Sequence, residues 1–151
     1  MKSYHHGNLK QELIDCASKM CERDGYTKLS IRSLAKESNV SQTAPYRHFK
    51  TKEDLYAEIA TEGFNKLHKT ISKNQSSDSE KNLTIGAKAY IKFGLNNANT
   101  YDLMFGTAVP DFTKYPLLFQ SANKTYLHIR TKFNEFSKIK DQKLIEEKCV
   151  Y

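Results

Sequence analysis

Residues 29–64, LSIRSLAKESNVSQTAPYRHFKTKEDLYAEIATEGF, carry most of the information about the fold. Hydrophobic side chains recur in this stretch at helical spacing, and serines stand where helices typically begin. Ser30 is suited to be the N-cap of a short helix from Ile31 to Ser38, which Asn39 ends because asparagine tolerates a positive φ. Ser41 is suited to cap a second short helix, from Ser41 to about Phe49. The stretch therefore predicts two short helices joined by a tight turn.

A longer helix is predicted on the N-terminal side of this pair, from about Leu9 to Asp24. Its apolar residues fall on one face, at the spacing of an amphipathic helix. Asn8 and Gln11 resemble a capping box at its start, and Gly25 is placed to end it in the left-handed conformation. Such a helix can support the two shorter ones.

Two pairs of residues shape the chain after the turn. Pro45 and Phe49 lie four residues apart in the second short helix, and we expect them to face inward together. Pro45 falls at the fourth helical position, where its ring removes one hydrogen bond that the first turn can spare. Thr51 and Asp54 stand at capping-box spacing and predict a further helix that runs to about Ser72.

The second half of the sequence is also predicted to be helical. Residues 73–81 are polar and aperiodic, which predicts a loop. Residues 82–97 are apolar nearly all round, which predicts a central, buried helix, and a short helix is expected around residues 101–105. A long helix is predicted over residues 117–139, with a 3-4 seam for packing against another helix made of Phe119, Ala122, Tyr126, Ile129, Phe133 and Phe136.

Two helices of about eight residues, joined by a tight turn and supported by a longer first helix, are typical of a helix-turn-helix. The major groove of DNA, about 12 Å wide, admits one helix, whose N-terminal residues contact base edges. We therefore expect Gln42, Thr43 and Ala44 to contact bases, since glutamine pairs with adenine and small methyl groups meet the thymine methyl. The same exposed face continues through Tyr46 and Arg47.

The basic residues near this segment predict contacts with phosphates. The net charge of +7 fits a polyanionic partner, but residues 1–60 hold ten lysines and arginines against eight acidic residues, so most of the excess lies elsewhere. Residues 41–52 contain no acidic residue, and phosphate contacts are expected from Tyr46, His48 and Lys52. Lys52, at the start of a helix, adds its charge to N–H groups that already favour anions. Spacing alone leaves open a plain helical bundle with a solvated polar face.

The same residues closely resemble the N-terminal domain of the tetracycline-repressor (TetR) family of regulators. Residues 40–55, VSQTAPYRHFKTKEDL, match the family's third helix and the start of its fourth nearly position by position. Residues 4–17, YHHGNLKQELIDCA, are similar to one branch, in which the second domain has an apolar helix followed by a segment like NTYDLMFG, here Asn99–Gly106. The resemblance covers about residues 4 to 136.

The resemblance implies a homodimer that binds a near-palindromic DNA operator, as a repressor released when a small molecule enters the C-terminal domain. The domains it implies are a DNA-binding domain over residues 6–66 and a ligand and dimerisation domain over residues 67–151. It also implies DNA contacts by Gln42, Thr43, Ala44, Tyr46, His48 and Lys52, and backbone contacts by Ser30, Arg32 and Ser33 of the preceding helix.

The sequence departs from the family pattern in three places. Asn39 replaces the usual glycine, and Pro45 replaces the common leucine or isoleucine. The branch normally continues with two more long helices carrying a tryptophan and a His-Gly pair, whereas this sequence has no tryptophan and ends at Tyr151. We therefore expect an all-α protein whose C-terminal domain lacks its last helices. The alternative is a shortened regulator with impaired dimerisation that acts as an interaction protein or is inactive.

Aromatic residues of the second half are candidates for an effector pocket, although aromatic residues at helical spacing also form ordinary cores. The candidates are Phe93, Tyr101, Met104, Phe105, Phe112, Phe119 and Tyr126. The three cysteines, Cys16, Cys21 and Cys149, match no common zinc spacing and fit reduced thiols of a cytoplasmic protein. No metal or cofactor is expected.

Other function classes find little support in the sequence. It lacks a Ser-His-Asp order, a glycine-rich phosphate loop and paired carboxylates in an apolar setting, so no enzyme is expected. His68 and His128 are isolated on separate predicted helices. No apolar run reaches the roughly 18 residues that a transmembrane helix needs, so no membrane partner is expected.

Overall fold

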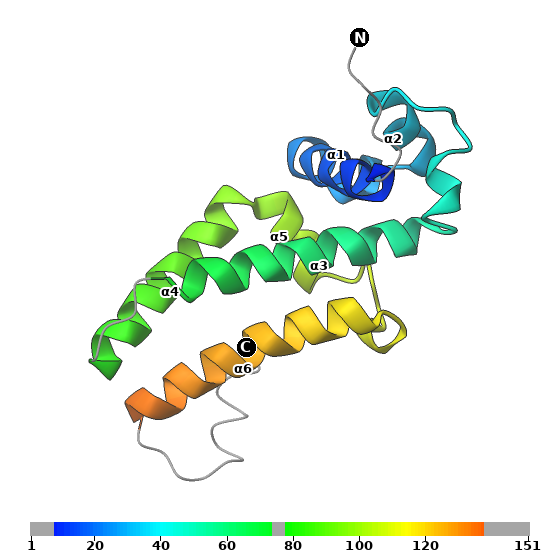
Figure 1. Cartoon of the computed structure of the whole chain (residues 1–151). Coiled ribbons are helices and arrows are strands. Elements are labelled where there is room, and N and C mark those ends of the chain that lie inside the picture. The colour runs from blue at the N-terminus through cyan, green and yellow to red at the C-terminus, as the bar shows by residue number, and fades with distance from the viewer. Residues whose placement is uncertain (1–7, 74–77, 138–151) are drawn as a thin grey trace. The chain divides into compact units, whose positions relative to one another are not determined.

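The computed structural model describes residues 8–73 and 78–137, and within these ranges the chain is all-α (Figure 1). The α-helices are α1 (Leu9–Asp24), α2 (Ile31–Glu37), α3 (Lys52–Ile71), α4 (Ser79–Asn96), α5 (Ala98–Phe105) and α6 (Pro116–Ser137). Short 3₁₀ helices lie between some of them: η1 (Tyr26–Lys28), η2 (Pro45–Arg47) and η3 (Phe112–Lys114). The all-α fold expected from the sequence is confirmed, whereas the expected lack of the last helices stays a prediction.

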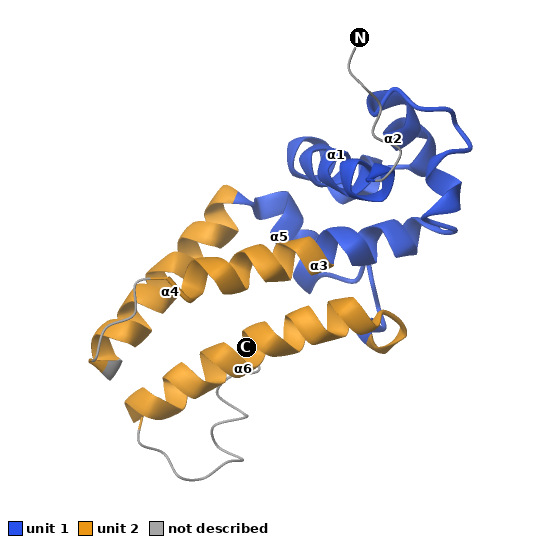
Figure 2. Cartoon of the chain, viewed as in Figure 1, with its two compact units in different colours: residues 1–60, 97–112 blue, residues 61–96, 113–151 orange. Residues whose placement is uncertain are grey.

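The chain forms two compact units (Figure 2). Unit 1 comprises residues 1–60 and 97–112, and unit 2 comprises residues 61–96 and 113–151. α3 begins in unit 1 and ends in unit 2, whereas α5 belongs to unit 1 although it follows α4 in the sequence. The functional division near residue 66 that the resemblance implies is a different kind of boundary and stays a prediction.

α1 has the bounds expected from its periodicity, but its N-terminal cap was predicted wrongly. Asn8 makes no capping hydrogen bond through its side chain. The Gln11 side chain instead donates to Asp15, one turn further along the helix, at 3.0 Å, so the reciprocal pair does not form. At the other end Gly25 has the expected positive φ of 83°, and its ψ of 147° leads the chain away in an extended direction.

The caps of α2 form as the sequence predicts. The Ser30 side chain accepts a hydrogen bond from the Ser33 backbone N–H, and the Ser33 hydroxyl in turn accepts from the Ser30 N–H. Asn39 follows the helix with a φ of 53°, the left-handed conformation that asparagine tolerates. The Val40 N–H then donates to the Ala35 carbonyl at 3.0 Å, which closes the turn.

The segment expected to be a helix from Ser41 to Phe49 is not α-helical. It consists of turns over residues 42–44 and of η2, Pro45–Arg47. The Ala44 N–H donates to the Ser41 carbonyl and the Arg47 N–H to the Ala44 carbonyl, both three residues back, as in a 3₁₀ helix. Pro45 has no N–H to give the four-residue bond at this place, so the first turn tightens. The segment keeps a right-handed turn, since Ala44 has φ −59° and ψ −46°.

The segment from Ser41 to Phe49 is anchored in the core of unit 1 by two of its own side chains. Pro45 and Phe49 are buried together, as predicted, and Phe49 is only 1% exposed. α3 begins with the predicted capping box, in which Thr51 and Asp54 each donate a backbone N–H to the other's side chain. The remaining buried apolar side chains include Leu13, Ala17, Leu29, Leu34, Leu55, Ile59, Leu103 and Met104.

Two expectations for unit 2 are wrong. α4 is not a buried central helix: Phe93 is buried, but Ile91 is 61% and Leu95 77% exposed. α4 packs on α6, and Ile91 and Leu95 lie outside this contact, at the surface. The predicted 3-4 seam of α6 is not its buried face either, since Phe119 and Phe136 are exposed.

The face that α6 buries instead carries Leu118, Ser121 and Thr125. Thr125 donates its hydroxyl to the Ser121 carbonyl at 2.9 Å and lies 3.3 Å from the Phe64 carbonyl of α3. Small hydroxyl side chains let helices approach closely while their own polar atoms are satisfied. The sequence periodicity therefore identified one apolar face of α6, but the face that is buried in the structure is the neighbouring one.

Candidate nucleic-acid interface

The candidate interface is the outer face of the segment between α2 and α3. Gln42, Thr43, Tyr46, Arg47 and His48 are exposed, and Tyr46 keeps 47% of its surface accessible. Ala44 is half-buried, and the Ser41 hydroxyl lies 3.3 Å from that of Thr43. The segment therefore presents its polar side chains to solvent while its apolar residues anchor it in the core.

The predicted DNA-contacting residues at the start of α2 differ in their exposure and in the hydrogen bonds of their side chains. Arg32 is exposed, whereas Ser30 and Ser33 are half-buried. The hydroxyls of both serines are held in the capping box, and that of Ser33 also donates to the Ser30 carbonyl at 2.9 Å. The two serines therefore stabilise the first turn of α2. Arg32 lies in the same turn, and its side chain is exposed.

Lys52 is held in place at the start of α3. Its ammonium group donates to the Thr27 carbonyl at 3.1 Å and lies 5.2 Å from the centre of the Tyr56 ring. The Tyr56 hydroxyl donates to the Tyr26 carbonyl at 2.6 Å, and the two tyrosine rings meet edge to face. Lys52 is nevertheless exposed, so its charge remains available to an anion at this helix N-terminus.

The sequence predicted Lys52 but missed the tyrosines that hold it. Tyr56 lies four residues after Lys52 on the same helix, a spacing at which a lysine and an aromatic ring meet. That spacing is the signal that could have identified Tyr56. The part played by Tyr26 and Thr27 depends on the return of η1 toward α3, which no local pattern reveals.

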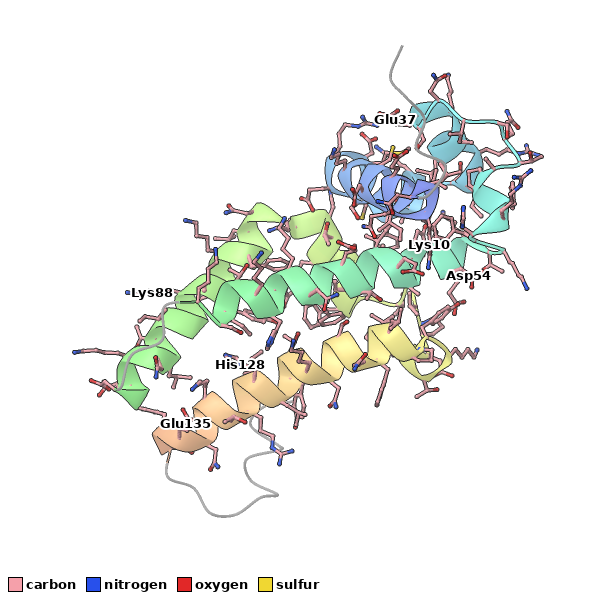
Figure 3. The ribbon with its side chains drawn as sticks, viewed as in Figure 1. Lys10, Glu37, Asp54, Lys88, His128 and Glu135 are labelled. Carbon is pink, nitrogen blue, oxygen red and sulfur yellow. The ribbon has the colours of Figure 1, made fainter. Side chains whose placement is uncertain are left out.

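Ion pairs join the helices around this face. Arg23, near the end of α1, pairs with Glu37 at the end of α2 at 2.9 Å, and Glu37 is labelled in Figure 3. Arg23 also pairs with its neighbour Asp24, and this contact holds the pKa of the Asp24 carboxyl below its usual range. Lys10 of α1 pairs with Glu58 of α3. The pairs are exposed or partly exposed, so each contributes at most about 1 kcal/mol to stability.

The predicted effector residues are divided between the two units. Tyr101, Met104, Phe105 and Phe112 lie in unit 1, and Phe93, Phe119 and Tyr126 in unit 2. Phe93 and Met104 are buried, the rings of Tyr101 and Phe105 lie 4.5 Å apart, and Phe119 is 51% exposed. An open hollow at the start of α4 is lined by other residues, Asp78, Glu80, Lys81, Thr84 and Ile85.

Two further findings concern other classes of site. His68 of α3 and His128 of α6, isolated in the sequence, lie with ring centres 5.2 Å apart. Within residues 8–73 and 78–137, no three histidine, cysteine, aspartate or glutamate side chains gather as a metal site requires. Among the helices described, none is both long and apolar enough to cross a bilayer.

The residues that form this face belong to a stretch that matches a known protein family. Residues 13–59 match the model of a family described as bacterial regulatory proteins, tetR family. A Bacillus subtilis (strain 168) protein, described as the uncharacterized HTH-type transcriptional regulator YobS, is 24% identical over 97 residues, which are 64% of this chain and 51% of that protein. The chain thus spans about half the length of this curated relative.

Solved structures share the fold over most of the chain. A protein of unknown function from Rhodococcus sp. RHA1 is 26% identical, with a TM-score of 0.73 over 89% of this chain and 71% of its own. The TetR family transcriptional regulator PfmR from Thermus thermophilus is 18% identical, with a TM-score of 0.65 over 89% of this chain and 76% of its own. The matches include both the helix-turn-helix and the helices that follow it.

Proposed function

The chain belongs, through its N-terminal helix-turn-helix, to the tetR family of bacterial regulatory proteins, and from this premise we propose that it regulates transcription by binding a specific DNA operator. The observation that carries the proposal is the division of residues 41–52 into a buried anchor and an exposed polar face. Pro45 and Phe49 form the anchor. Residues 41–52 contain basic side chains and no acidic one, so the face suits a polyanion.

Specificity would come from the first residues of this face. Gln42 offers an amide that pairs with adenine in the major groove, and Thr43 and Ala44 offer methyl groups to thymine. The three residues form the turn that precedes η2, an exposed ridge that a major groove about 12 Å wide can admit. The bonds that close the turn fix this ridge before DNA arrives.

Phosphate contacts would orient the ridge. Tyr46, Arg47 and His48 are exposed beside it, Lys52 is held over Tyr56, and Arg32 lies on α2. Contacts to phosphates set the register of a protein on DNA without distinguishing sequences. Ser30 and Ser33 would contribute their backbone at the start of α2 rather than their engaged hydroxyls.

We propose that the regulator acts as a homodimer, formed through residues 67–151, while residues 6–66 bind DNA. Unit 2 exposes large apolar side chains, and such surfaces mark protein interfaces when they are extensive. On α4 and α6 they are Ile91, Leu95, Leu117, Phe119, Leu127 and Phe136. Two copies related by a two-fold axis would place their two recognition segments, residues 41–49 of each copy, about 34–36 Å apart on a near-palindromic operator.

Release by a small molecule is the form of regulation that we propose for the repressor. The aromatic residues of the second half supply the stacking and apolar surface that an organic effector needs. Phe112 and Tyr126 are half-buried, so part of their surface is accessible to a ligand. The cysteine usage favours action in the reducing cytoplasm.

Selection of DNA by the full chain tests the proposal. Duplexes chosen from a random-sequence library are re-measured against scrambled duplexes of the same composition at several salt concentrations. We expect a preference of roughly 10³-fold or more for the selected duplex, and an affinity whose logarithm falls linearly with the logarithm of salt concentration. Equal binding to selected and scrambled duplexes would contradict a specific regulator.

A further inference from the structure

Lys52, at the start of α3, contacts two uncharged groups of unit 1. Its ammonium group donates to the Thr27 carbonyl of η1 at 3.1 Å and lies 5.2 Å from the centre of the Tyr56 ring. A lysine ammonium has three donors, and Thr27 takes one of them. Because neither partner carries a charge, these contacts orient the ammonium while its positive charge remains for a phosphate.

The groups that hold Lys52 are themselves fixed. Tyr56 is 7% exposed, its hydroxyl donates to the Tyr26 carbonyl at 2.6 Å, and the two tyrosine rings meet edge to face with their centres 5.5 Å apart. Thr27 lies in η1, which the Leu29 N–H closes by donating to the Tyr26 carbonyl at 3.1 Å. We call Tyr26, Thr27 and Tyr56 the Lys52 socket. Since a buried ring and a closed turn form it, the socket is complete in the free chain.

A short and ordered connection joins the socket to the recognition segment. Lys52 follows the buried Phe49 by three residues, and the capping box of Thr51 and Asp54 fixes the turn between them. Asp54, labelled in Figure 3, lies in this first turn of α3. A phosphate bound by Lys52 would therefore be held at a set position relative to residues 42–44, which are assigned to bases.

The socket lowers the cost of binding a phosphate. A lysine side chain is flexible, and immobilising one such side chain at an interface weakens binding by about twofold to tenfold. The Lys52 socket restricts this side chain already in the free chain, so less freedom is lost when a phosphate binds. The gain applies to all DNA sequences alike, because a phosphate contact carries no sequence information.

We propose that Tyr56 is a positioning residue for DNA binding, whose ring holds the Lys52 ammonium in the place where it meets a phosphate. Tyr56 itself touches no DNA, since it is buried. Tyr26 supports Tyr56 by accepting the hydrogen bond from its hydroxyl. This inference rests on the proposed function and adds to it a residue that the predicted DNA contacts do not include.

A double-mutant cycle on the full chain tests the proposal. The DNA is a duplex that the wild-type chain selects from a random-sequence library. Lys52→Met removes the ammonium and keeps an unbranched side chain, and Tyr56→Leu removes the ring. We expect Tyr56→Leu to bind the duplex about fivefold more weakly than the wild-type chain, with unchanged base preferences. Once residue 52 is methionine, Tyr56→Leu should weaken binding no further.

Two more variants separate positioning from support of the fold. Tyr56→Phe keeps the ring and loses only the hydroxyl, so it should recover most of the affinity that Tyr56→Leu loses. Phe64→Leu, the matched control, removes a ring that is 4% exposed from the same helix and should bind like the wild-type chain. A loss in either variant as large as that in Tyr56→Leu would refute positioning by the ring.

Nuclear magnetic resonance of the wild-type chain needs no variant. Protons held over the face of an aromatic ring are shifted upfield. We expect such a shift for the Lys52 methylene group next to the ammonium, both in the free chain and with the selected duplex bound. Signals at the positions of a freely rotating lysine would contradict the proposal, and this result is obtained even where Tyr56→Leu does not fold.

The outcomes separate this inference from the proposed function. If Tyr56→Leu weakens binding equally with lysine and with methionine at position 52, positioning is refuted and the regulator stands. If Lys52→Met binds the selected duplex as the wild-type chain does, Lys52 contacts no phosphate, and the inference again fails alone. If the wild-type chain selects no duplex, the proposed function fails and the inference fails with it.

Discussion

The helix-turn-helix region and the α4–α6 region treat their apolar side chains differently. In the first, Pro45 and Phe49 are fully enclosed and the ends of α2 and α3 are capped. In the second, Ile91 and Leu95 of α4 are mostly exposed. The difference indicates that the first region buries these apolar side chains within the chain, whereas the second leaves an apolar surface suited to a further protein partner.

Removal of a buried aromatic ring should give the largest loss in the free energy of unfolding. The same substitution at an exposed position of the second region should cost much less. Phe49→Ala leaves a cavity under the recognition segment, and we expect a loss of about 3–5 kcal/mol in the free energy of unfolding, measured in denaturant. Phe119→Ala removes the same ring from a position that is 51% exposed, and in the monomer, at a concentration too low for association, it is expected to cost less than about 1 kcal/mol. Similar losses for both would contradict the contrast between the regions.

A charge on the exposed face of α4 should affect association rather than folding. Leu95→Lys is expected to weaken the homodimer that we propose by at least about tenfold, since a buried unpaired charge opposes association, while the stability of the monomer changes little. Asn96→Lys adds the same charge at the neighbouring exposed position and serves as the control. Sedimentation velocity measures both, and an unaltered dimer in Leu95→Lys would place the interface elsewhere.

The histidine pair of unit 2 should make stability depend on pH, with a smaller effect. Burial, Lys124 and the neighbouring ring lower the pKa of His68, and burial and Lys132 lower that of His128, against opposing contributions from Glu135 and the Ile71 carbonyl. The folded chain therefore binds fewer protons than the unfolded chain, so stability is full above about pH 6.5, the usual histidine pKa, and falls below it.

Denaturant unfolding between pH 5 and pH 8 measures this dependence. The Nδ1 atom of His68 is buried with no hydrogen-bond partner among the described residues, so a proton there gains no acceptor. We expect the double variant His68→Gln, His128→Gln to lose the part of the slope near pH 6 that the histidines cause. A slope that persists unchanged would assign it to other groups.

Local signals in the sequence predicted the features that depend on neighbouring residues. Ser30, Asn39 and Thr51 lie at helix ends as expected, because caps involve residues only three or four apart. The sequence also placed Pro45 in the recognition segment but did not predict a 3₁₀ turn, because the choice between three- and four-residue bonds depends on how the segment docks on the core.

Features that depend on tertiary packing could not be predicted. The apolar pattern of α4 is the same whether or not a partner covers it, so exposure of Leu95 has no sequence signal. The contact between Glu22 and Thr100 joins residues 78 positions apart, and neither has a local pattern that indicates the other. Periodicity shows which residues can be buried, and packing determines which of them are.

The most direct test of the account compares two variants of the recognition segment in the selection of DNA. Gln42 is assigned to a base and Tyr46 to a phosphate, although both are exposed on the same short segment. Gln42→Ala should relax base preference at one position of each half-site at a cost of about 1–3 kcal/mol for the preferred base, whereas Tyr46→Ala should weaken binding to all duplexes alike. If both variants retain the wild-type base preferences and lose affinity equally, this segment does not recognise the operator bases.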